Sequence, residues 1–366
     1  MDSRVLPDTE QINYLCAVGL GPIAYAAYGE DFKKSDPKIF DALYGAELAT
    51  RLIYSQIEAA AEQVARDLQD IGIVPIFLKG ISTSNEFYAP PYHRVMADLD
   101  ILVRDSEVDL VMSKIGTLGY EISGDQWRVY QETGHHHLPE ARHPDTGICI
   151  EVHTGLFAPD EFYANEAVFQ ADVFLGQTAN FDFKGSRVAR FTPEYQLVFT
   201  VSKWSVDRDW AINIKNINDL IHILRKHETS FDWPVLTHWF EKNPHLVPIT
   251  SALIQYLEQA DLVTVSPQMH AALDHPARKL ASRSAKTIAW LLHTFPFNAG
   301  DKRYSGYARW SAHALWLYLT KPDNRDLGIP GALWQQFYLS LLYGKYSPFG
   351  KLLAGIRKSP ARMKRH

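Results

Sequence analysis

Cysteine is scarce in this chain: 366 residues include only two, Cys16 and Cys149. They lie far apart and outside any metal-ligand spacing, which excludes a disulfide scaffold and a cysteine-based zinc site. The N-terminal MDSRVLPDTEQ lacks the basic and apolar segments of a signal peptide. Apolar runs all fall short of the ~20 residues that a membrane span needs. We therefore expect a cytoplasmic protein with no membrane span.

A strong excess of one charge is also missing. The net charge is −5, so the composition shows no basic footprint for nucleic acid, and we do not expect nucleic acid as the main partner. Hydrophobic residues make up 46% and charged residues 22%, as in ordinary globular proteins. The length suits roughly two domains.

The first half of the chain mixes helical and strand patterns. Apolar residues recur at helical spacing over 48–68, and 74–78 is a short apolar run typical of a buried strand. Residues 107–118 predict a helix that ends at Gly119. Turn residues and alternation predict the remaining elements, which are a short helix at 82–88, a loop at 89–94, a strand at 120–122 and a hairpin of 135–142 and 148–153 joined by 143–147.

The second half is predicted to be mostly helical. Thr192-Pro193-Glu194 is typical of a helix start, and a helical stripe of apolar residues follows over 214–224. Further helical patterns cover 249–262, 271–295, 310–320 and 333–343. We predict an α+β fold in which a mixed β-sheet flanked by helices precedes a mostly helical C-terminal domain. The predicted divisions are an N-terminal helical segment 1–44, an α/β domain 45–190, a helical domain 191–345 and a basic tail 346–366.

Two aspartates interrupt the apolar stretch RVMADLDILV (94–103). In a strand, Asp98 and Asp100 share one face with Cα atoms about 6.5 Å apart. Burying such a pair costs several kcal/mol unless a cation meets it, and Mg²⁺ is bound by carboxylates together with substrate phosphates. Two metals held ~4 Å apart would clamp the attacking and leaving oxygens of a phosphoryl displacement. The alternative is a solvated strand edge.

Two further segments fit a phosphate-transfer site. Glu151 is a single acid inside the apolar ICIEVH (148–153), and we predict it as the third carboxylate. In LKG (78–80), Lys79 supplies positive charge and Gly80 lets the backbone approach a phosphate closely. An ordinary surface lysine explains Lys79 equally well.

The run His135-His136-His137 favours a metal or pocket role. Adjacent residues of a strand alternate faces, so at most His135 and His137 would share a metal with His153. No cysteine spacing supports zinc. We interpret His137 and His153 as lining an acceptor pocket or positioning Glu151, and keep a histidine-dependent metallohydrolase as a less favoured alternative.

The helical half holds further candidates for the acceptor pocket. Lys203, with Trp204 and Trp210 nearby, could contact a nucleotide base or an acceptor, although core packing is the more common role of such tryptophans. Asp219 is spaced i,i+4 from Lys215, so a surface ion pair explains both without any function.

Four segments together resemble a known family. They are LKGIS (78–82), YHRVMADLDILV (92–103), LGY (118–120) and IEVHTGLF (150–157). Their order is similar to the pattern LKG, R-x-x-x-D-[IL]-D-x-LV, GY and E-[IVL]-H of the uncharacterised nucleotidyltransferase family, in the DNA polymerase β-type superfamily. The resemblance covers about residues 45–160 and extends loosely into the helical half.

This resemblance implies a nucleotidyltransferase fold and activity. A nucleoside monophosphate would pass from a nucleoside triphosphate such as ATP to a hydroxyl of an unidentified small molecule, peptide or protein, and diphosphate would leave. Asp98, Asp100 and Glu151 would be catalytic and would bind two Mg²⁺ ions, which Mn²⁺ could replace. Bacterial biosynthetic pathways are a common setting for such relatives.

The resemblance also assigns nucleotide-binding residues. Gly80 and Ser82 stand where the superfamily has an adjacent Gly-Ser turn, with Ile81 between them here. Arg94 matches a family arginine that would neutralise the triphosphate, and Asp219 matches a family aspartate of the helical half. Because the turn is interrupted, the alternative interpretation is a non-catalytic relative that binds nucleotide or a partner.

Overall fold

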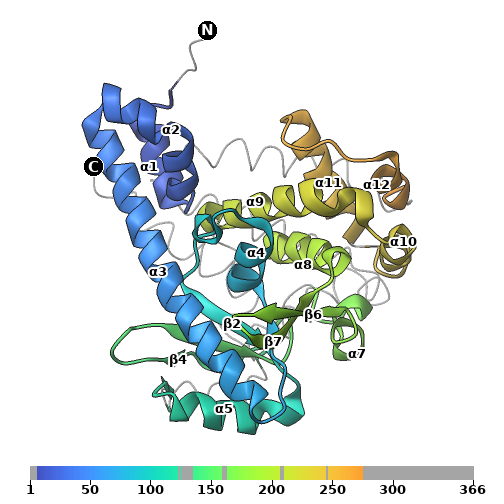
Figure 1. The fold of residues 1–366 in the computed structure, drawn as a ribbon. Helices are drawn as coiled ribbons and strands as arrows, with labels where there is room; N and C mark the ends of the chain where they lie inside the picture. The colour runs from blue at the N-terminus through green and yellow to red at the C-terminus, as the bar shows by residue number, and fades with distance from the viewer. Residues whose placement is uncertain are drawn as a thin grey trace, which may run out of the picture.

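A mixed β-sheet forms the centre of the molecule (Figure 1). The computed structural model describes residues 6–122, 124, 135–158, 163–206, 210–244 and 246–274. Within them the sheet has seven strands in the order β3-β4-β5-β2-β1-β7-β6. The strands are β1 (Ile76–Phe77), β2 (Asp98–Leu102), β3 (Glu121–Ile122), β4 (Ala141–Arg142), β5 (Cys149–His153), β6 (Thr178–Phe183) and β7 (Ser186–Phe191).

Parallel and antiparallel pairs are mixed in this sheet. β2 pairs with β5, and β1 with β7, in parallel. β1 and β2 are antiparallel to each other, as are β3 and β4, β4 and β5, and β6 and β7. The predicted α+β class with a mixed sheet is therefore confirmed.

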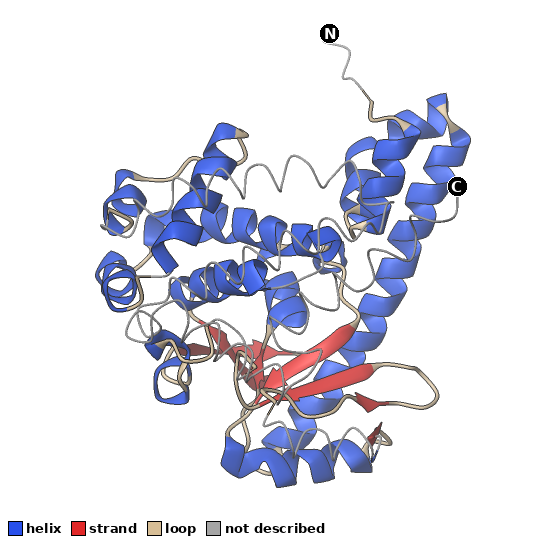
Figure 2. Ribbon diagram, turned by 180° about the vertical axis from the view of Figure 1, so that it is seen from behind, coloured by secondary structure: helices blue, strands red, loops and turns tan. Residues whose placement is uncertain are grey.

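Helices cover both faces of the sheet (Figures 1 and 2). On one face, α3 (Pro37–Gln69) and α5 (Val108–Thr117) pack over strand residues such as Phe77, Leu99 and Ile150. The alternate residues Ile76 and Leu102 point to the opposite core, which the helices after residue 190 complete. The period of two along each strand thus divides the apolar side chains between two layers.

The long helix α3 joins the sheet to an N-terminal helical pair. Asp36 caps it by accepting from the amides of Lys38 and Ile39, and Pro37 occupies its first turn. Its first half packs against α1 (Thr9–Ala17) and α2 (Gly21–Ser35), and its second half packs on the sheet. The helix runs continuously through the predicted division between residues 44 and 45.

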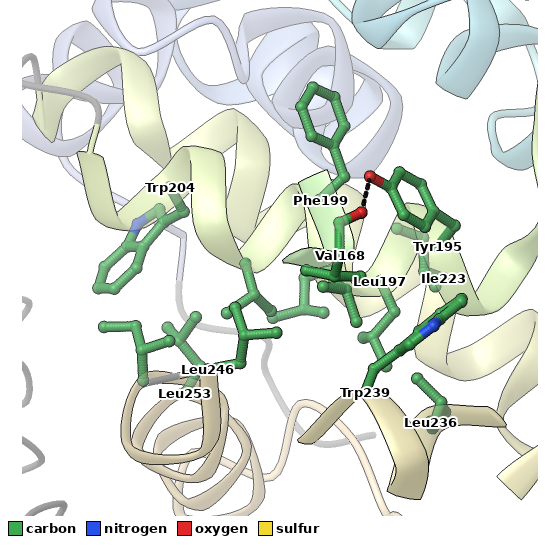
Figure 3. Packing of buried hydrophobic residues seen from close by; sticks show 14 of the residues in the cluster. Val168, Tyr195, Leu197, Phe199, Trp204, Ile223, Leu236, Trp239, Leu246 and Leu253 are labelled. Atoms are coloured by element: carbon green, nitrogen blue, oxygen red, sulfur yellow. Dashed lines mark hydrogen bonds between the residues drawn. The ribbon is translucent and has the colours of Figure 1, made fainter. Parts of the chain in front are cut away.

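The helical half builds the larger core. Figure 3 shows Trp204 and Trp239 buried there, with the Tyr195 hydroxyl donating to the Val168 carbonyl at 2.8 Å. Trp204 is a core residue in the last turn of α8. The helices of this layer and of the connections are α4 (Lys79–Phe87), α7 (Ala171–Phe174), α8 (Pro193–Val206), α9 (Trp210–His227), α10 (Trp233–Lys242), α11 (Leu246–Gln259) and α12 (Pro267–Ala272), with 3-10 turns η1 (Pro91–His93), η2 (Asp105–Glu107), η3 (Ala167–Phe169) and η4 (Glu228–Ser230).

Several predicted elements differ from the structure or fall outside it. The hairpin β6–β7 was not predicted, and it closes through Lys184 and Gly185, both with positive φ as a two-residue hairpin turn requires. The predicted strand 135–142 is reduced to Ala141–Arg142 and a single bridge at His137. The side chain of Trp210, the predicted helices beyond residue 274 and the basic tail lie outside the described residues. Among the described helices, none combines the length and apolar character needed to cross a bilayer.

Candidate active site

Three carboxylates meet on one face of the two central parallel strands. In the register of β2 and β5, Asp100 lies opposite Glu151 and Asp98 lies opposite Cys149. Directly paired residues of neighbouring strands point to the same side, so Asp98, Asp100 and Glu151 share a face. Strand β2 begins at Asp98 rather than at the apolar residues before it. Asp98 therefore lies at the start of β2 and Asp100 at its centre, and Glu151 lies at the centre of β5.

Lys79 reaches into this group of acids. It follows β1 and opens α4, and its Nζ lies 2.6 Å from Asp100 Oδ1 and 3.8 Å from Glu151 Oε2. Its side chain is 32% exposed, whereas that of Asp100 is 3% exposed. Lys79 has φ of 44°, a left-handed conformation that a side chain disfavours by about 1 kcal/mol or more. A strained backbone thus accompanies the contact between the lysine and the acids.

The His153 imidazole contacts two of the acids, Asp100 and Glu151. Its Nε2 lies 2.8 Å from Asp100 Oδ1, to which it donates, and 3.4 Å from Glu151 Oε2. The ring is buried, and among the described residues its Nδ1 has no hydrogen-bond partner. Candidate ligand atoms of Asp100, Glu151 and His153 all lie within 4.8 Å of one another. The arrangement brings together one sequence-predicted pocket histidine and two of the predicted metal ligands.

Electrostatics leave this site short of positive charge. Burial, and then the charges of Asp100 and Glu151, raise the pKa of Asp98 from 3.8 to about 6. Burial would also raise the pKa of Asp100, but Lys79 and the hydrogen bond from His153 hold it below its usual value. Burial would raise the pKa of Glu151 as well, but the hydrogen bond with His153 and the charge of Lys79 act together to hold it below its usual value. Lys79 pairs with Asp100 and Glu151, and although the charges of Lys79 and Lys215 both lower the pKa of Asp98, that pKa stays above its usual value.

Gly80 and Ser82 lie inside the first turns of α4 instead of in an open loop. A Cβ on Gly80 would approach Met96 Cβ to 2.8 Å, so glycine allows the helix to pack against the segment before β2. Ser82 is 2% exposed. No side chain among the described residues caps this helix N-terminus. Its backbone amides and helix dipole are the groups that would face an anion there.

Arg94 and Asp219 form a buried ion pair that joins the segment before β2 to α9. Arg94 Nη2 and Nε lie 2.7 and 2.8 Å from the two Asp219 oxygens, and Nη1 donates to the Val95 carbonyl at 2.6 Å. The Tyr88 hydroxyl donates to Asp219 at 2.7 Å. Both ionised side chains are at most 8% exposed. The interpretation of Asp219 as half of a surface pair with Lys215 is wrong, because Asp219 points into the core.

Sequence reasoning missed Tyr88. It follows α4 directly, and its phenol has a raised pKa because of burial and the neighbouring Asp219 carboxylate. Asn218 donates to its oxygen at 2.9 Å. Nothing in the sequence distinguishes this tyrosine, since its partners come from a helix about 130 residues later.

The three consecutive histidines lie together beside the acids. Their ring centroids are 4.2 to 4.8 Å apart, and the rings of His136 and His137 lie 5.5 and 5.2 Å from that of His153. The expectation that only His135 and His137 would share a face is wrong, because the segment is not a regular strand. Lys203 is near enough to His136 to lower its pKa, after the larger effect of burial. His137, His153 and Lys203 thus border one region, and Asp219 is enclosed elsewhere.

Comparisons with known proteins place the chain in a family. A family model described as uncharacterised nucleotidyltransferase matches residues 9–243. A crystal structure of an antigenic nucleotidyltransferase-like protein from Paracoccidioides brasiliensis is similar at 15% sequence identity and a TM-score of 0.34, over 54% of this chain and 93% of that chain. No curated protein matches the chain.

Proposed function

The chain belongs to the uncharacterised nucleotidyltransferase family, and we propose that it transfers a nucleoside monophosphate from a nucleoside triphosphate to an acceptor hydroxyl. In this reaction the hydroxyl oxygen bonds to the α-phosphorus, the bond between that phosphorus and the bridging oxygen breaks, and diphosphate leaves. The hydroxyl proton passes to a carboxylate or to water. The acceptor is a small molecule, a peptide or a protein.

One observation carries this proposal: Asp98, Asp100 and Glu151 point from adjacent parallel strands toward one place. The donor set is made of carboxylate oxygens, which fit a hard divalent cation. The raised pKa of Asp98 is a second sign of fit, because burial and the neighbouring carboxylates both disfavour its charge, and a bound cation would offset both effects. We propose that these three residues hold Mg²⁺, for which Mn²⁺ can substitute.

When bound, Mg²⁺ would neutralise phosphate charge and lower the pKa of a coordinated hydroxyl. The protein residues then have separate tasks. His153 holds Asp100 and Glu151 in a fixed orientation through its Nε2. Lys79 is exposed enough to turn from Asp100 toward a phosphate oxygen, and the N-terminus of α4 presents amides to the same anion.

The remaining predicted residues keep weaker roles in this proposal. Gly80 allows α4 to approach the sheet, and Ser82 stays a predicted phosphate contact although it is buried. Arg94 is fully engaged by Asp219, so its predicted contact with the triphosphate requires that ion pair to open. For the acceptor we propose His137 and Lys203 at the rim of the acids.

The test uses the purified chain with Mg²⁺ and each of the common nucleoside triphosphates. Diphosphate release or self-labelling should appear with at least one of them and should stop when EDTA removes the metal. Asp100→Asn should lower the rate roughly 100-fold or more, because it removes a charge that acts on the transferred group. Asp109→Asn, at an exposed acid of α5, is the matched control and should leave the rate unchanged.

A nucleotide-binding protein without catalysis is the competing outcome. It is favoured by the position of Gly80 and Ser82 within a packed helix rather than an open phosphate loop. Calorimetric titration separates the two: nucleotide binding that needs no metal and survives Asp98→Asn unchanged would exclude the proposed reaction. Binding that requires Mg²⁺ and is lost in Asp98→Asn supports it.

A further inference from the structure

We propose that His135, His136 and His137 form a binding site for a borderline divalent transition-metal ion such as Zn²⁺, separate from the proposed Mg²⁺ ligands. This inference concerns a second cation of different chemistry and does not depend on nucleotidyl transfer. Candidate ligand atoms of the three imidazoles all lie within 4.8 Å of one another. Imidazole nitrogens favour Zn²⁺ and its neighbours, whereas carboxylate oxygens favour Mg²⁺.

The hydrogen bonding of the rings fits a ligand role. His137 donates from Nδ1 to the Leu138 carbonyl at 2.8 Å, which leaves Nε2 with a free lone pair. Metal-binding histidines commonly use this arrangement, in which the outer ring nitrogen is fixed by a backbone carbonyl. The Nδ1 of His136 is buried and, among the described residues, has no hydrogen-bond partner. Such a buried nitrogen is costly unless something binds it.

The backbone of this segment is fixed to the sheet. The His136 carbonyl accepts from the amides of both Thr154 and Gly155 at 3.0 Å, and the Leu138 amide donates to the Val152 carbonyl at 2.8 Å. His137 forms a bridge with His153. The three rings are therefore presented by backbone tied to β5, which lowers the entropy that metal binding would have to overcome.

Protonation favours a metal as well. Imidazole binds metal in its neutral form, and a histidine with its ordinary pKa of about 6.5 is already mostly neutral at physiological pH. One neighbour acts against a cation: the Lys203 ammonium lies close enough to the His136 ring to repel a second positive charge there. The site should therefore bind zinc more weakly than the same three rings would alone, and removing this charge should strengthen binding.

The experiment uses the full chain without a histidine tag, stripped with EDTA and titrated with Zn²⁺ against a chromophoric chelator in excess Mg²⁺. We expect about one equivalent of Zn²⁺ per chain, and a Co²⁺ spectrum that indicates nitrogen ligation. His136→Gln and His137→Gln should each weaken binding roughly tenfold or more. His238→Gln, at an exposed histidine of α10, is the matched control and should bind like the parent.

Lys203→Met gives a test that does not depend on loss of a ligand. It should tighten zinc binding severalfold, because it removes a positive charge close to the ion. The proposal is overturned if the parent chain binds no stoichiometric Zn²⁺, or if His136→Gln and His238→Gln bind alike. It is also overturned if Asp98→Asn and Glu151→Gln abolish zinc binding while His136→Gln preserves it, since the ion would then occupy the carboxylates.

Discussion

Two ionic centres within the described part of the chain, one at β2 and one at Arg94, differ in how their charges balance. Around β2, Lys79 lies against Asp100 and Glu151, and burial together with the negative charge of these two acids raises the pKa of Asp98. A few residues before this strand, the Arg94 guanidinium donates to a single carboxylate, that of Asp219. Its Nε and Nη2 each donate to a different oxygen of that carboxylate.

The difference separates the proposed binding centre from a structural one. Asp219 accepts from the guanidinium and from Tyr88, so its lone pairs are largely occupied. Asp98 and the partly exposed Lys79 keep capacity for a ligand. Burial alone therefore does not identify a functional acid. The indication is a buried carboxylate whose negative charge is not fully neutralised by a neighbouring positive side chain.

The largest expected loss of stability comes from breaking the buried pair of Arg94 and Asp219. Asp219→Ala should lower the free energy of unfolding by about 3–5 kcal/mol, because it leaves the Arg94 guanidinium buried without a counter-charge. The double variant Arg94→Met with Asp219→Leu should cost less than Asp219→Ala alone. Urea-induced unfolding, followed by circular dichroism, measures both.

The surface pair Arg66–Glu62, with an N–O distance of 2.6 Å, supplies the control for that comparison. Glu62→Ala should cost about 0.5 kcal/mol or less, since the Arg66 side chain is exposed and that of Glu62 is partly exposed. A cost of Asp219→Ala as small as that of Glu62→Ala would contradict the assignment of the buried pair as the link between the segment before β2 and α9.

A smaller change in stability, this time a gain, is expected when a carboxylate is removed from the acids of β2 and β5. The pKa of Asp98 rises on folding from 3.8 to about 6, so the folded chain holds more protons between those values. The free energy of unfolding of the metal-free protein therefore falls as pH rises from about 4 to about 6. Asp98→Asn should be more stable than the parent above that window by about 1–3 kcal/mol.

Chemical denaturation of EDTA-treated protein at several pH values checks this sign. Below the window the parent and Asp98→Asn should have similar stability, because the parent carboxyl is then protonated in both states. Added Mg²⁺ should reduce the advantage of the variant. An Asp98→Asn protein that is less stable than the metal-free parent at neutral pH would mean that the acids are already balanced.

The smallest expected effect concerns the backbone of Lys79. Lys79→Gly and Lys79→Ala both remove the ammonium, but only glycine adopts φ of 44° without strain. Lys79→Gly should therefore be more stable than Lys79→Ala by about 1 kcal/mol. Thermal unfolding of the two variants measures the difference, and equal melting temperatures would show that the left-handed conformation is not maintained.

Local sequence patterns predicted the family and much of the fold. The resemblance carried by LKG, DLD and EVH is confirmed by the family match over residues 9–243. The helix from 48 to 68 exists but begins at Pro37, because Asp36 and Pro37 provide its start. The hairpin β6–β7 was missed although TANFDF alternates polar and apolar residues, because SRVARF alternates irregularly and the turn is Lys184-Gly185 rather than the usual Asn-Gly or Asp-Gly.

The sequence predicted which acids lie in the site, but not which side chains pair with the buried charges. Asp98, Asp100 and Glu151 stand out because each is a charged residue in an apolar run, and their chemical roles stay predictions. Spacing within α9 suggested a pair of Lys215 with Asp219, whereas Arg94 proved to be the partner. Likewise, strand alternation separated three histidines that an irregular backbone brings together.

The sequence by itself determined which residues carry charge into apolar segments, because that pattern is local and needs only the period of a strand. Only the tertiary structure decided which opposite charge each one meets. Asp100 and Lys79 are 21 residues apart and Asp219 and Arg94 are 125 apart, so their meeting depends on how strands and helices pack. Burial then fixes the result, since a charge removed from water must find its partner among the groups that packing brings near.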